Sequence, residues 1–111
     1  MTDHTFDIGV LGGGSGGYAA ALRASELGKS VALIEKDKVG GTCLHRGCIP
    51  AKELLETAHV YRTVAKAARF GVETSAPTLQ FSTTMDRKRE VVEGLFNGLS
   101  GLLKHRKVTV F

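Results

Sequence analysis

Two short runs of apolar residues near the N-terminus predict buried strands. They cover residues 6–11, which lead into a run of glycines, and residues 30–34. Residues 18–27 between them are rich in alanine and favour a helix, and Gly28 follows as a C-terminal glycine often does. A strand, a helix and a second strand within about 30 residues indicate a βαβ unit. We therefore expect an α/β fold that begins with this unit.

The next part of the chain predicts a loop and then a long helix. Residues 39–47 are rich in glycine and are expected to form the loop. The helix should begin near Pro50, whose fixed φ suits a first turn, and end at Gly71. Apolar positions at spacings of three and four predict one buried stripe on it, formed by Leu54, Ala58, Tyr61, Ala65 and Ala68.

A second long helix is predicted in the last third of the chain. Residues 72–81 look irregular, and the helix should be capped by Ser82, or by Thr83 in a capping box with Asp86. Its expected buried stripe consists of Met85, Val92, Leu95, Leu99 and Leu102. A neighbouring face holds Gly94, Gly98 and Gly101, each costing about 1 kcal/mol relative to alanine inside a helix. Either another segment packs closely there or the helix is weak.

Composition and charge exclude several classes of protein. The chain has 111 residues, 42% of them hydrophobic, and no apolar run approaches the length of about 20 residues that a membrane span needs. Two cysteines are too few for a disulfide scaffold, and the polar N-terminus shows no export signal, so we expect a cytoplasmic protein. The net charge of +4 comes from residues 51–111. Residues 87–89 form one basic cluster, and no aromatic residues lie between its members. We therefore expect these charges to lie on solvated helix faces, and we expect no nucleic-acid partner.

The glycine run after the first strand matches a dinucleotide-binding loop. Gly12, Gly14 and Gly17 give the pattern G-x-G-x-x-G between a strand and a helix, and Glu35 follows at the end of the second strand. The first glycine permits a tight turn, the second lets the backbone approach a pyrophosphate, and the third allows helix and strand to pack closely. An acidic residue at this distance is suited to ribose hydroxyls. The pattern does not distinguish FAD from NAD.

Two cysteines, Cys43 and Cys48, allow three interpretations. They are inert buried thiols, or they bind a metal together with His45, or they form a redox-active disulfide. The metal interpretation matches no zinc spacing, and we expect no metal site. Five positions on a regular helix rise about 7.5 Å, too far for a disulfide, so that interpretation places Cys43 on a loop bent back by Gly47. Cys48 would then begin the helix, where the dipole and Lys52 favour a thiolate.

Three motifs together resemble the pyridine nucleotide–disulfide oxidoreductases. They are Gly12-x-Gly14-x-x-Gly17, Glu35-Lys36 and Gly41-Thr42-Cys43-x-x-x-x-Cys48-Ile49-Pro50-x-Lys52. The resemblance implies that residues 1–111 are the N-terminal part of a Rossmann-like FAD-binding domain, an incomplete doubly wound sheet with two longer helices after it. The cysteine block looks like that of members that oxidise dihydrolipoamide with NAD⁺, and glutathione, mycothione and mercuric reductases carry very similar blocks. The chain departs from the common pattern at Ala51, where serine or threonine is usual.

The resemblance also implies a role for each matching residue. The three loop glycines would hold the FAD pyrophosphate and Glu35 the adenosine ribose, while three further residues would lie along the cofactor: Lys36, Thr42 and Lys52. Cys48 would be the thiol nearest the flavin and Cys43 the thiol that exchanges with a disulfide or dithiol substrate such as lipoamide. A homodimer and a 2-oxo acid dehydrogenase complex are the implied partners.

The same resemblance implies that this chain alone is not a working enzyme. Members also need an NAD domain, a dimerisation domain and a C-terminal His–Glu pair, and we expect none of these within residues 1–111. Residues 108–111 look like a strand with nothing left to pair with it. Two alternatives of other classes remain: a dinucleotide-binding module without catalysis, which would leave the cysteines idle, and a small non-catalytic redox protein.

Overall fold

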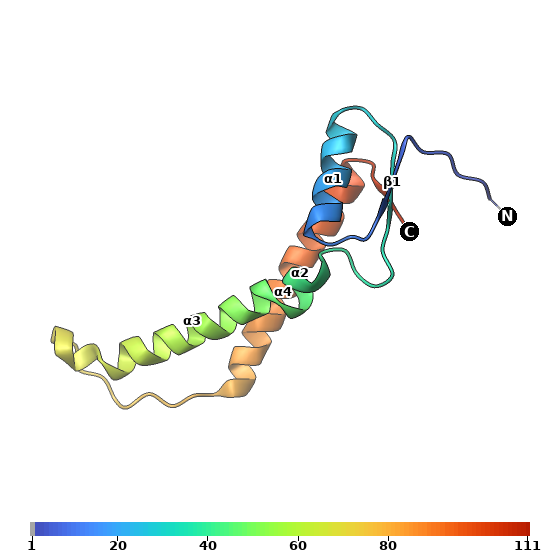
Figure 1. Ribbon diagram of the computed structural model, residues 1–111. Coiled ribbons are helices and arrows are strands. Elements are labelled where there is room, and N and C mark those ends of the chain that lie inside the picture. Colours follow the sequence, from blue (N-terminus) through green and yellow to red (C-terminus); the bar gives the residue numbers. More distant parts are fainter. Residues whose placement is uncertain (1) are drawn as a thin grey trace.

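The computed structural model describes residues 2–111, and it shows a small α/β part from which long helices extend (Figure 1). In chain order the elements are β1 (Ile8–Leu11), α1 (Ser15–Glu26), β2 (Val31–Ile34), α2 (Gly41–Arg46), α3 (Cys48–Ala65), the 3₁₀ helix η1 (Ala67–Phe70), α4 (Phe81–His105) and β3 (Thr109–Val110). The chain extends over 66 × 27 × 18 Å, with a radius of gyration of 20.0 Å. A compact domain of this length has a radius of gyration of about 13 Å. The described residues are therefore markedly elongated.

The sheet is parallel, in the order β1-β2-β3. Ile8 lies opposite Val31 across the first pair of strands, and Leu33 lies opposite Val110 across the second. This pairing confirms the α/β fold and the βαβ unit. The expectation that the last strand lacks a partner is wrong. β1 occupies only one edge of β2, so the other edge offers its N–H and C=O groups to β3, and the Phe111 N–H donates to the Leu33 carbonyl at 2.9 Å.

The hydrophobic core lies where α1 and the end of α4 cover the sheet. Its buried members come from β2, from α1 and α4, and from the segments just before α2 and β3: Ala21, Val31, Leu33, Val39, Leu103 and Val108. Full burial of a side chain such as Leu33 stabilises the fold by about 1.5–3 kcal/mol. The core thus holds β2 and α1, the helix that follows the glycine run, in fixed relation.

The predicted loop over residues 39–47 is wrong, because most of it is the helix α2. Glycines are confined to the ends of this segment, where Gly40 and Gly41 have φ of 114° and 63°. The interior from Thr42 to Arg46 contains no helix breaker, and Leu44 anchors the short helix by being buried. The glycine content of residues 39–47 favours a loop only when the segment is taken as a whole. The glycines lie at its ends, and the residues between them can form a helix.

The long helix α3 forms where it was predicted, but its apolar stripe is not buried. Pro50 lies in its first turn, and Gly71, with φ of 75°, terminates η1 after it. No side chain of α3 is buried among the described residues, and Leu54 and Tyr61 are 37% and 42% exposed. Figure 1 shows why: α3 diverges from α4, and of the described residues only those returning from η1 to α4 lie beside the outer half of α3.

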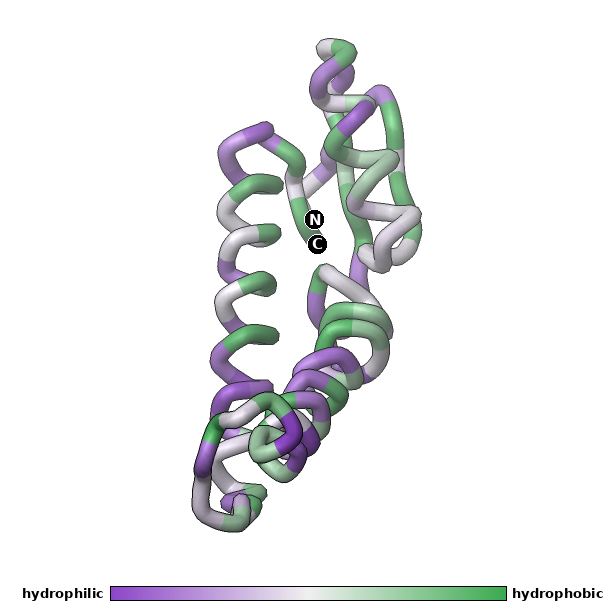
Figure 2. The backbone as a smooth tube through the Cα atoms, turned by 90° about the vertical axis from the view of Figure 1, so that its left-hand side faces the viewer, coloured by the Kyte–Doolittle hydropathy of each residue, from purple (hydrophilic) through white to green (hydrophobic). Residues whose placement is uncertain are grey.

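Helix α4 corrects two further expectations. It begins at Phe81 after Gln80, and no side chain caps it, so the predicted Ser82 or Thr83 cap and the capping box are wrong. Hydrophobic positions recur along one side of α4 (Figure 2). Of the predicted stripe, however, Leu95 and Leu102 are 47% and 42% exposed, and Leu103 is buried instead. At its end α4 therefore packs on the core with a face shifted by one residue from the predicted stripe, with Leu103 in place of Leu102.

In the basic cluster Arg87 and Arg89 are exposed as expected, whereas Lys88 is half-buried. Arg87 pairs with Glu53 of α3 at 2.9 Å, and Arg89 pairs with Asp86. Among the described residues no helix combines the length and the apolar composition needed to cross a membrane.

Candidate functional site

The glycine loop between β1 and α1 is held by its own backbone geometry. Gly12 has φ of +99°, in the left-handed region that favours glycine, and its N–H donates to the Ile34 carbonyl at 2.7 Å. A Cβ at Gly17 would overlap the carbonyl of Gly12, so this position admits no side chain. The tight turn and the close helix–strand packing predicted from the sequence are therefore both present.

The N-terminus of α1 is open for an anion. Gly14 is its N-cap residue and provides no side-chain cap, and the first intrahelical bond runs from the Tyr18 N–H to the Gly14 carbonyl at 2.9 Å. The N–H groups before Tyr18 have no carbonyl of their own helix to bond. A Cβ on Gly14 would have no closer neighbour than Gly41 Cα at 4.0 Å. The loop thus combines uncapped donors, a positive dipole end and empty space, which fits a pyrophosphate.

Glu35 joins the end of β2 to this loop. Its Oε2 accepts the Gly13 N–H at 2.7 Å, and its Oε1 accepts the Asp37 N–H at 3.0 Å. These backbone donors, Gly13 first, lower the pKa of the Glu35 carboxyl below its usual value. The side chain is therefore a fixed carboxylate beside the glycine loop. Lys36, predicted to lie along the same ligand, follows it on the surface.

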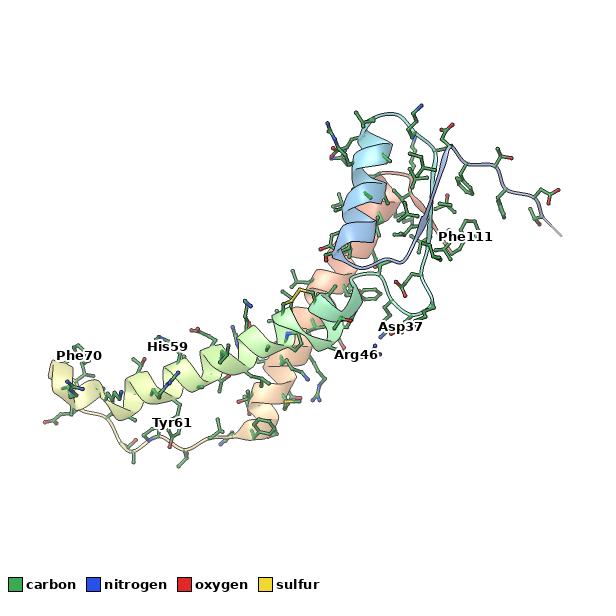
Figure 3. The ribbon with its side chains drawn as sticks, viewed as in Figure 1. Asp37, Arg46, His59, Tyr61, Phe70 and Phe111 are labelled. Atoms are coloured by element: carbon green, nitrogen blue, oxygen red, sulfur yellow. A yellow bond between two sulfur atoms is a disulfide. The ribbon has the colours of Figure 1, made fainter. Side chains whose placement is uncertain are left out.

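The two cysteines form a disulfide at the junction of α2 and α3, drawn as a yellow bond in Figure 3. Their Cα atoms are 4.6 Å apart, within the range of disulfides. Gly47 breaks the helix between them with φ of −135° and ψ of −111°, as the disulfide interpretation requires. Cys48 is the first residue of α3, but Cys43 lies on helix α2, which corrects the loop expected there.

The surroundings of the two sulfur-bearing residues differ. Cys48 is exposed at the N-terminus of an 18-residue helix, and Lys52 lies one turn further on the same helix, also exposed. Cys43 is half-buried and borders a cavity of about 320 Å³ that is lined by residues of α1, α2, α3 and α4. Thr42 is exposed beside it on α2. Within the described range no three potential ligands cluster as a metal site would need, and the pairing of both cysteines removes the thiolates that the metal interpretation used.

The glycine loop and the disulfide segment touch through their backbones. The Gly40 N–H donates to the Gly13 carbonyl at 2.7 Å. A Cβ on Gly41 would lie 2.7 Å from Gly14 Cα, so α2 can dock on the loop only because glycine starts it. Gly13, Gly40 and Gly41 were not assigned positioning roles from the sequence. The feature of the sequence that could have indicated these roles is the pair of consecutive glycines, Gly40 and Gly41, just before Thr42 and Cys43.

Comparisons with known proteins agree with this arrangement. Residues 6–111 match the family model described as pyridine nucleotide-disulphide oxidoreductase. The chain is 51% identical over 106 residues to a dihydrolipoyl dehydrogenase of Bacillus subtilis, covering 96% of this chain and 22% of the relative. It is 47% identical over 107 residues to that of Acholeplasma laidlawii, covering 96% and 32%. With a mitochondrial dihydrolipoyl dehydrogenase of Dictyostelium discoideum it shares 44% over 104 residues, covering 92% and 21%.

The chain thus spans between about a fifth and a third of the length of these relatives. The range of the family match includes the glycine loop, Glu35, the disulfide segment and both long helices. The glycine loop, the parallel sheet and the cysteine pair are joined in one structure, and the resemblance inferred from the motifs is confirmed. This chain belongs to the pyridine nucleotide-disulphide oxidoreductase family.

Proposed function

We propose that this chain is the FAD-binding and disulfide-bearing part of an enzyme that oxidises dihydrolipoamide to lipoamide. One observation carries the proposal: the Cys43–Cys48 disulfide is built onto the dinucleotide loop through the Gly40–Gly13 hydrogen bond and the Gly41–Gly14 contact. A dinucleotide-binding module alone would have no use for that connection. Dihydrolipoyl dehydrogenases among the relatives favour dihydrolipoamide over glutathione, mycothione or mercuric ion.

In this proposal the glycine loop and Glu35 hold the cofactor. The α1 N-terminus, with Gly12, Gly14 and Gly17, receives the pyrophosphate, and the Glu35 carboxylate accepts bonds from the ribose hydroxyls. When bound, FAD supplies an acceptor for two electrons. Three exposed residues are proposed to line the cofactor: Lys36 after β2, Thr42 on α2 and Lys52 on α3.

The thiol chemistry divides between the two cysteines. A substrate thiolate attacks Sγ of Cys43, a substrate–Cys43 bond forms, and the protein disulfide breaks with Cys48 as the leaving thiolate. The second substrate thiol, deprotonated, then displaces Cys43 and closes the substrate disulfide, so two electrons pass to the protein pair. Cys48 suits the leaving role because the dipole of α3 and the Lys52 ammonium favour a thiolate at the first residue of that helix.

The proposal extends to the larger assembly. NAD⁺ as final acceptor, a homodimer, a lipoyl-bearing 2-oxo acid dehydrogenase complex as partner and a cytoplasmic location follow the family resemblance. The family description itself pairs a pyridine nucleotide with a disulfide. Catalysis then requires parts that this chain does not supply, so we expect residues 1–111 alone to show no NADH-driven lipoamide reduction.

The cofactor assignment is tested by Gly14→Ala, with Gly16→Ala as the matched control. Neither added Cβ meets an atom closer than 4.0 Å, so both full-length variants should fold with wild-type stability. We expect Gly14→Ala to purify without flavin, because its methyl group fills the space of the phosphate, while Gly16→Ala keeps about one FAD per chain. Stoichiometric FAD on Gly14→Ala would overturn the assignment.

The thiol roles are tested by trapping. Reduced Cys48→Ser and Cys43→Ser variants of the full-length chain are incubated with excess lipoamide, whose ring opens when the protein thiolate attacks it, and acid quenching then stops thiol–disulfide exchange. Mass spectrometry should find at least tenfold more mixed disulfide with lipoamide in Cys48→Ser, which retains Cys43, than in Cys43→Ser, which retains Cys48. Exposure alone predicts the reverse, since Cys48 is the more exposed residue. Equal or reversed trapping contradicts the division of roles.

A further inference from the structure

The segment between the two cysteines reaches back to the loop that follows Glu35. His45 Nε2 lies 2.9 Å from the carbonyl oxygen of Val39, and Arg46 Nη2 donates to Asp37 Oδ2 at 3.1 Å. Figure 3 shows Asp37 and Arg46 turned toward one another, beside the junction that carries the disulfide. Both side chains of α2 thus contact the connection from β2 to α2.

The two contacts differ in strength. The Arg46 side chain is 75% exposed, and an ion pair in that setting contributes little. The His45 side chain is half-buried, its contact with Val39 is partly shielded from solvent, and its ring packs edge-on against Phe96 of α4 with centroids 5.3 Å apart. His45 is therefore the stronger attachment.

Neighbouring residues are arranged around the His45 ring. A Cβ on Gly40 would lie 3.1 Å from His45 Nε2 and would overlap the Leu44 side chain, so the glycine leaves room for both. Lys38 Nζ lies 5.8 Å from the centroid of the Phe96 ring, so the same loop covers this aromatic ring as well. Val39 itself is a buried core residue. The ring is thus attached to the hydrophobic core through Val39 and to α4 through Phe96.

We propose that His45 is a positioning residue that fixes α2, and with it Cys43, for closure of the disulfide with Cys48. His45 lies two positions after Cys43 on a helix of only six residues. Its Nε2–H donates to Val39 and holds α2 on the core when the two thiols are separate, so Cys43 stays within reach of Cys48. The inference rests on the part of the proposed function in which this pair opens and closes.

Removal of the His45 contact has a defined consequence for the redox equilibrium. In the disulfide form α2 is tied to α3 by the covalent bond as well as by His45. In the dithiol form only the non-covalent contacts hold it. Loss of the donor at position 45 therefore increases the freedom of the dithiol more than that of the disulfide, and the disulfide becomes easier to reduce.

The test measures this equilibrium directly in the full-length protein. Wild type, His45→Ala, His45→Gln and the control His59→Ala are equilibrated in buffers of reduced and oxidised dithiothreitol, where each reduction of the protein disulfide closes one dithiothreitol ring. Acid quenching, alkylation and mass spectrometry then count the Cys43 and Cys48 thiols. His59 is an exposed histidine on α3, away from the disulfide (Figure 3).

We expect His45→Ala to favour the dithiol about tenfold, equivalent to about 30 mV for this two-electron couple. His45→Gln should stay within twofold of wild type, because its amide nitrogen is as many bonds from Cβ as Nε2 and can donate to Val39. His59→Ala should not change the equilibrium. A His45→Ala equilibrium within twofold of wild type overturns the proposal, and so does an equal shift in His45→Gln.

The measurement separates this inference from the proposed function. Its readout is the number of Cys43 and Cys48 thiols and requires neither flavin binding nor lipoamide, so a shifted equilibrium in a protein that fails the flavin or trapping tests leaves the positioning role intact. If His45→Ala does not fold, His45→Leu, which retains apolar contact with Phe96 without a donor, replaces it, and the same tenfold and twofold criteria apply.

Discussion

Two sets of three glycines in this chain look similar in sequence and differ in structure. In the loop before α1, Gly12 has a positive φ, and a Cβ on Gly17 would overlap the Gly12 carbonyl. On α4, a Cβ on any of the three glycines would meet nothing within 4 Å among the described residues: Gly94, Gly98 and Gly101. The fold of this chain therefore requires Gly12 and Gly17, whereas Gly14 has neither a positive φ nor a close neighbour and its role is left to a ligand. None of the three glycines of α4 is required by the fold of the described residues.

The same contrast separates the two ends of the molecule. The α/β part buries Leu33 and Leu103 almost completely, whereas apolar residues at the outer end of the long helices stay exposed, with Phe70 at 83%. Because residues close to the glycine loop are tightly packed, the addition or removal of a single methyl group there should change the stability of the fold. Substitutions in the outer region should change the free energy of unfolding only through helix propensity, or through contacts with segments that pack there in the full-length protein.

The largest effect is expected for Gly17→Ala. The added methyl group overlaps a backbone oxygen of the β1–α1 turn, and neither side can move without shifting the strand or the helix. We expect a loss of about 3 kcal/mol or more in the free energy of unfolding, measured by urea denaturation, with loss of FAD. Wild-type stability in this variant would contradict the close packing seen here.

A second comparison uses two leucines of α4. Leu103→Ala removes a side chain that is 1% exposed in the core, and should cost about 2–3 kcal/mol. Leu95→Ala, at 47% exposure, should cost less than about 1 kcal/mol. Urea denaturation of the full-length variants measures both. A comparable loss at both positions would show that another segment buries Leu95 in the complete protein.

Gly98→Ala sharpens the comparison of the glycine sets. With nothing within 4 Å of the added Cβ, the substitution should raise the free energy of unfolding by about 0.5–1 kcal/mol through helix propensity alone. Denaturation of the 111-residue chain and of the full-length protein gives the result. A gain in the short chain with a loss in the longer one would identify a segment packed on this face.

The smallest effect concerns Glu35 and pH. Its pKa is lowered below the ordinary value of 4.5 by the Gly13 N–H, so the ionised form stabilises the folded loop above about that pH, and this contribution is lost as the pH falls through the lowered pKa. The thermal midpoint of Glu35→Gln should therefore lie slightly below that of wild type at pH 7. The difference should shrink as the pH is lowered below 4.5 and through the lowered pKa of Glu35, and Glu56→Gln, at an exposed residue of α3, serves as the matched control.

Much of the fold and most of the candidate site could be predicted from the sequence. The βαβ unit follows from two apolar runs around an alanine-rich helix, and Gly12 and Gly17 behave as their motif requires. The bend at Gly47 also follows from the cysteine spacing. Two of the errors were local, at the loop expected over residues 39–47 and at the cap of α4, and the others arose where the outcome depends on distant residues. The pairing of residues 109–110 with β2 and the exposure of Leu54 depend on which segments meet, and local pattern does not contain that information.

The sequence by itself determined the chemistry of the site: a glycine loop for a dinucleotide, a carboxylate after β2 and two cysteines around a bending glycine. These features are local, because each depends on backbone geometry within a few residues. Only the tertiary structure decided that Gly40 and Gly41 join the two motifs, and that His45 contacts Val39 and Phe96. Those contacts bring together backbone and side chains from separate elements, so they exist only once α2 and α4 have packed against the sheet.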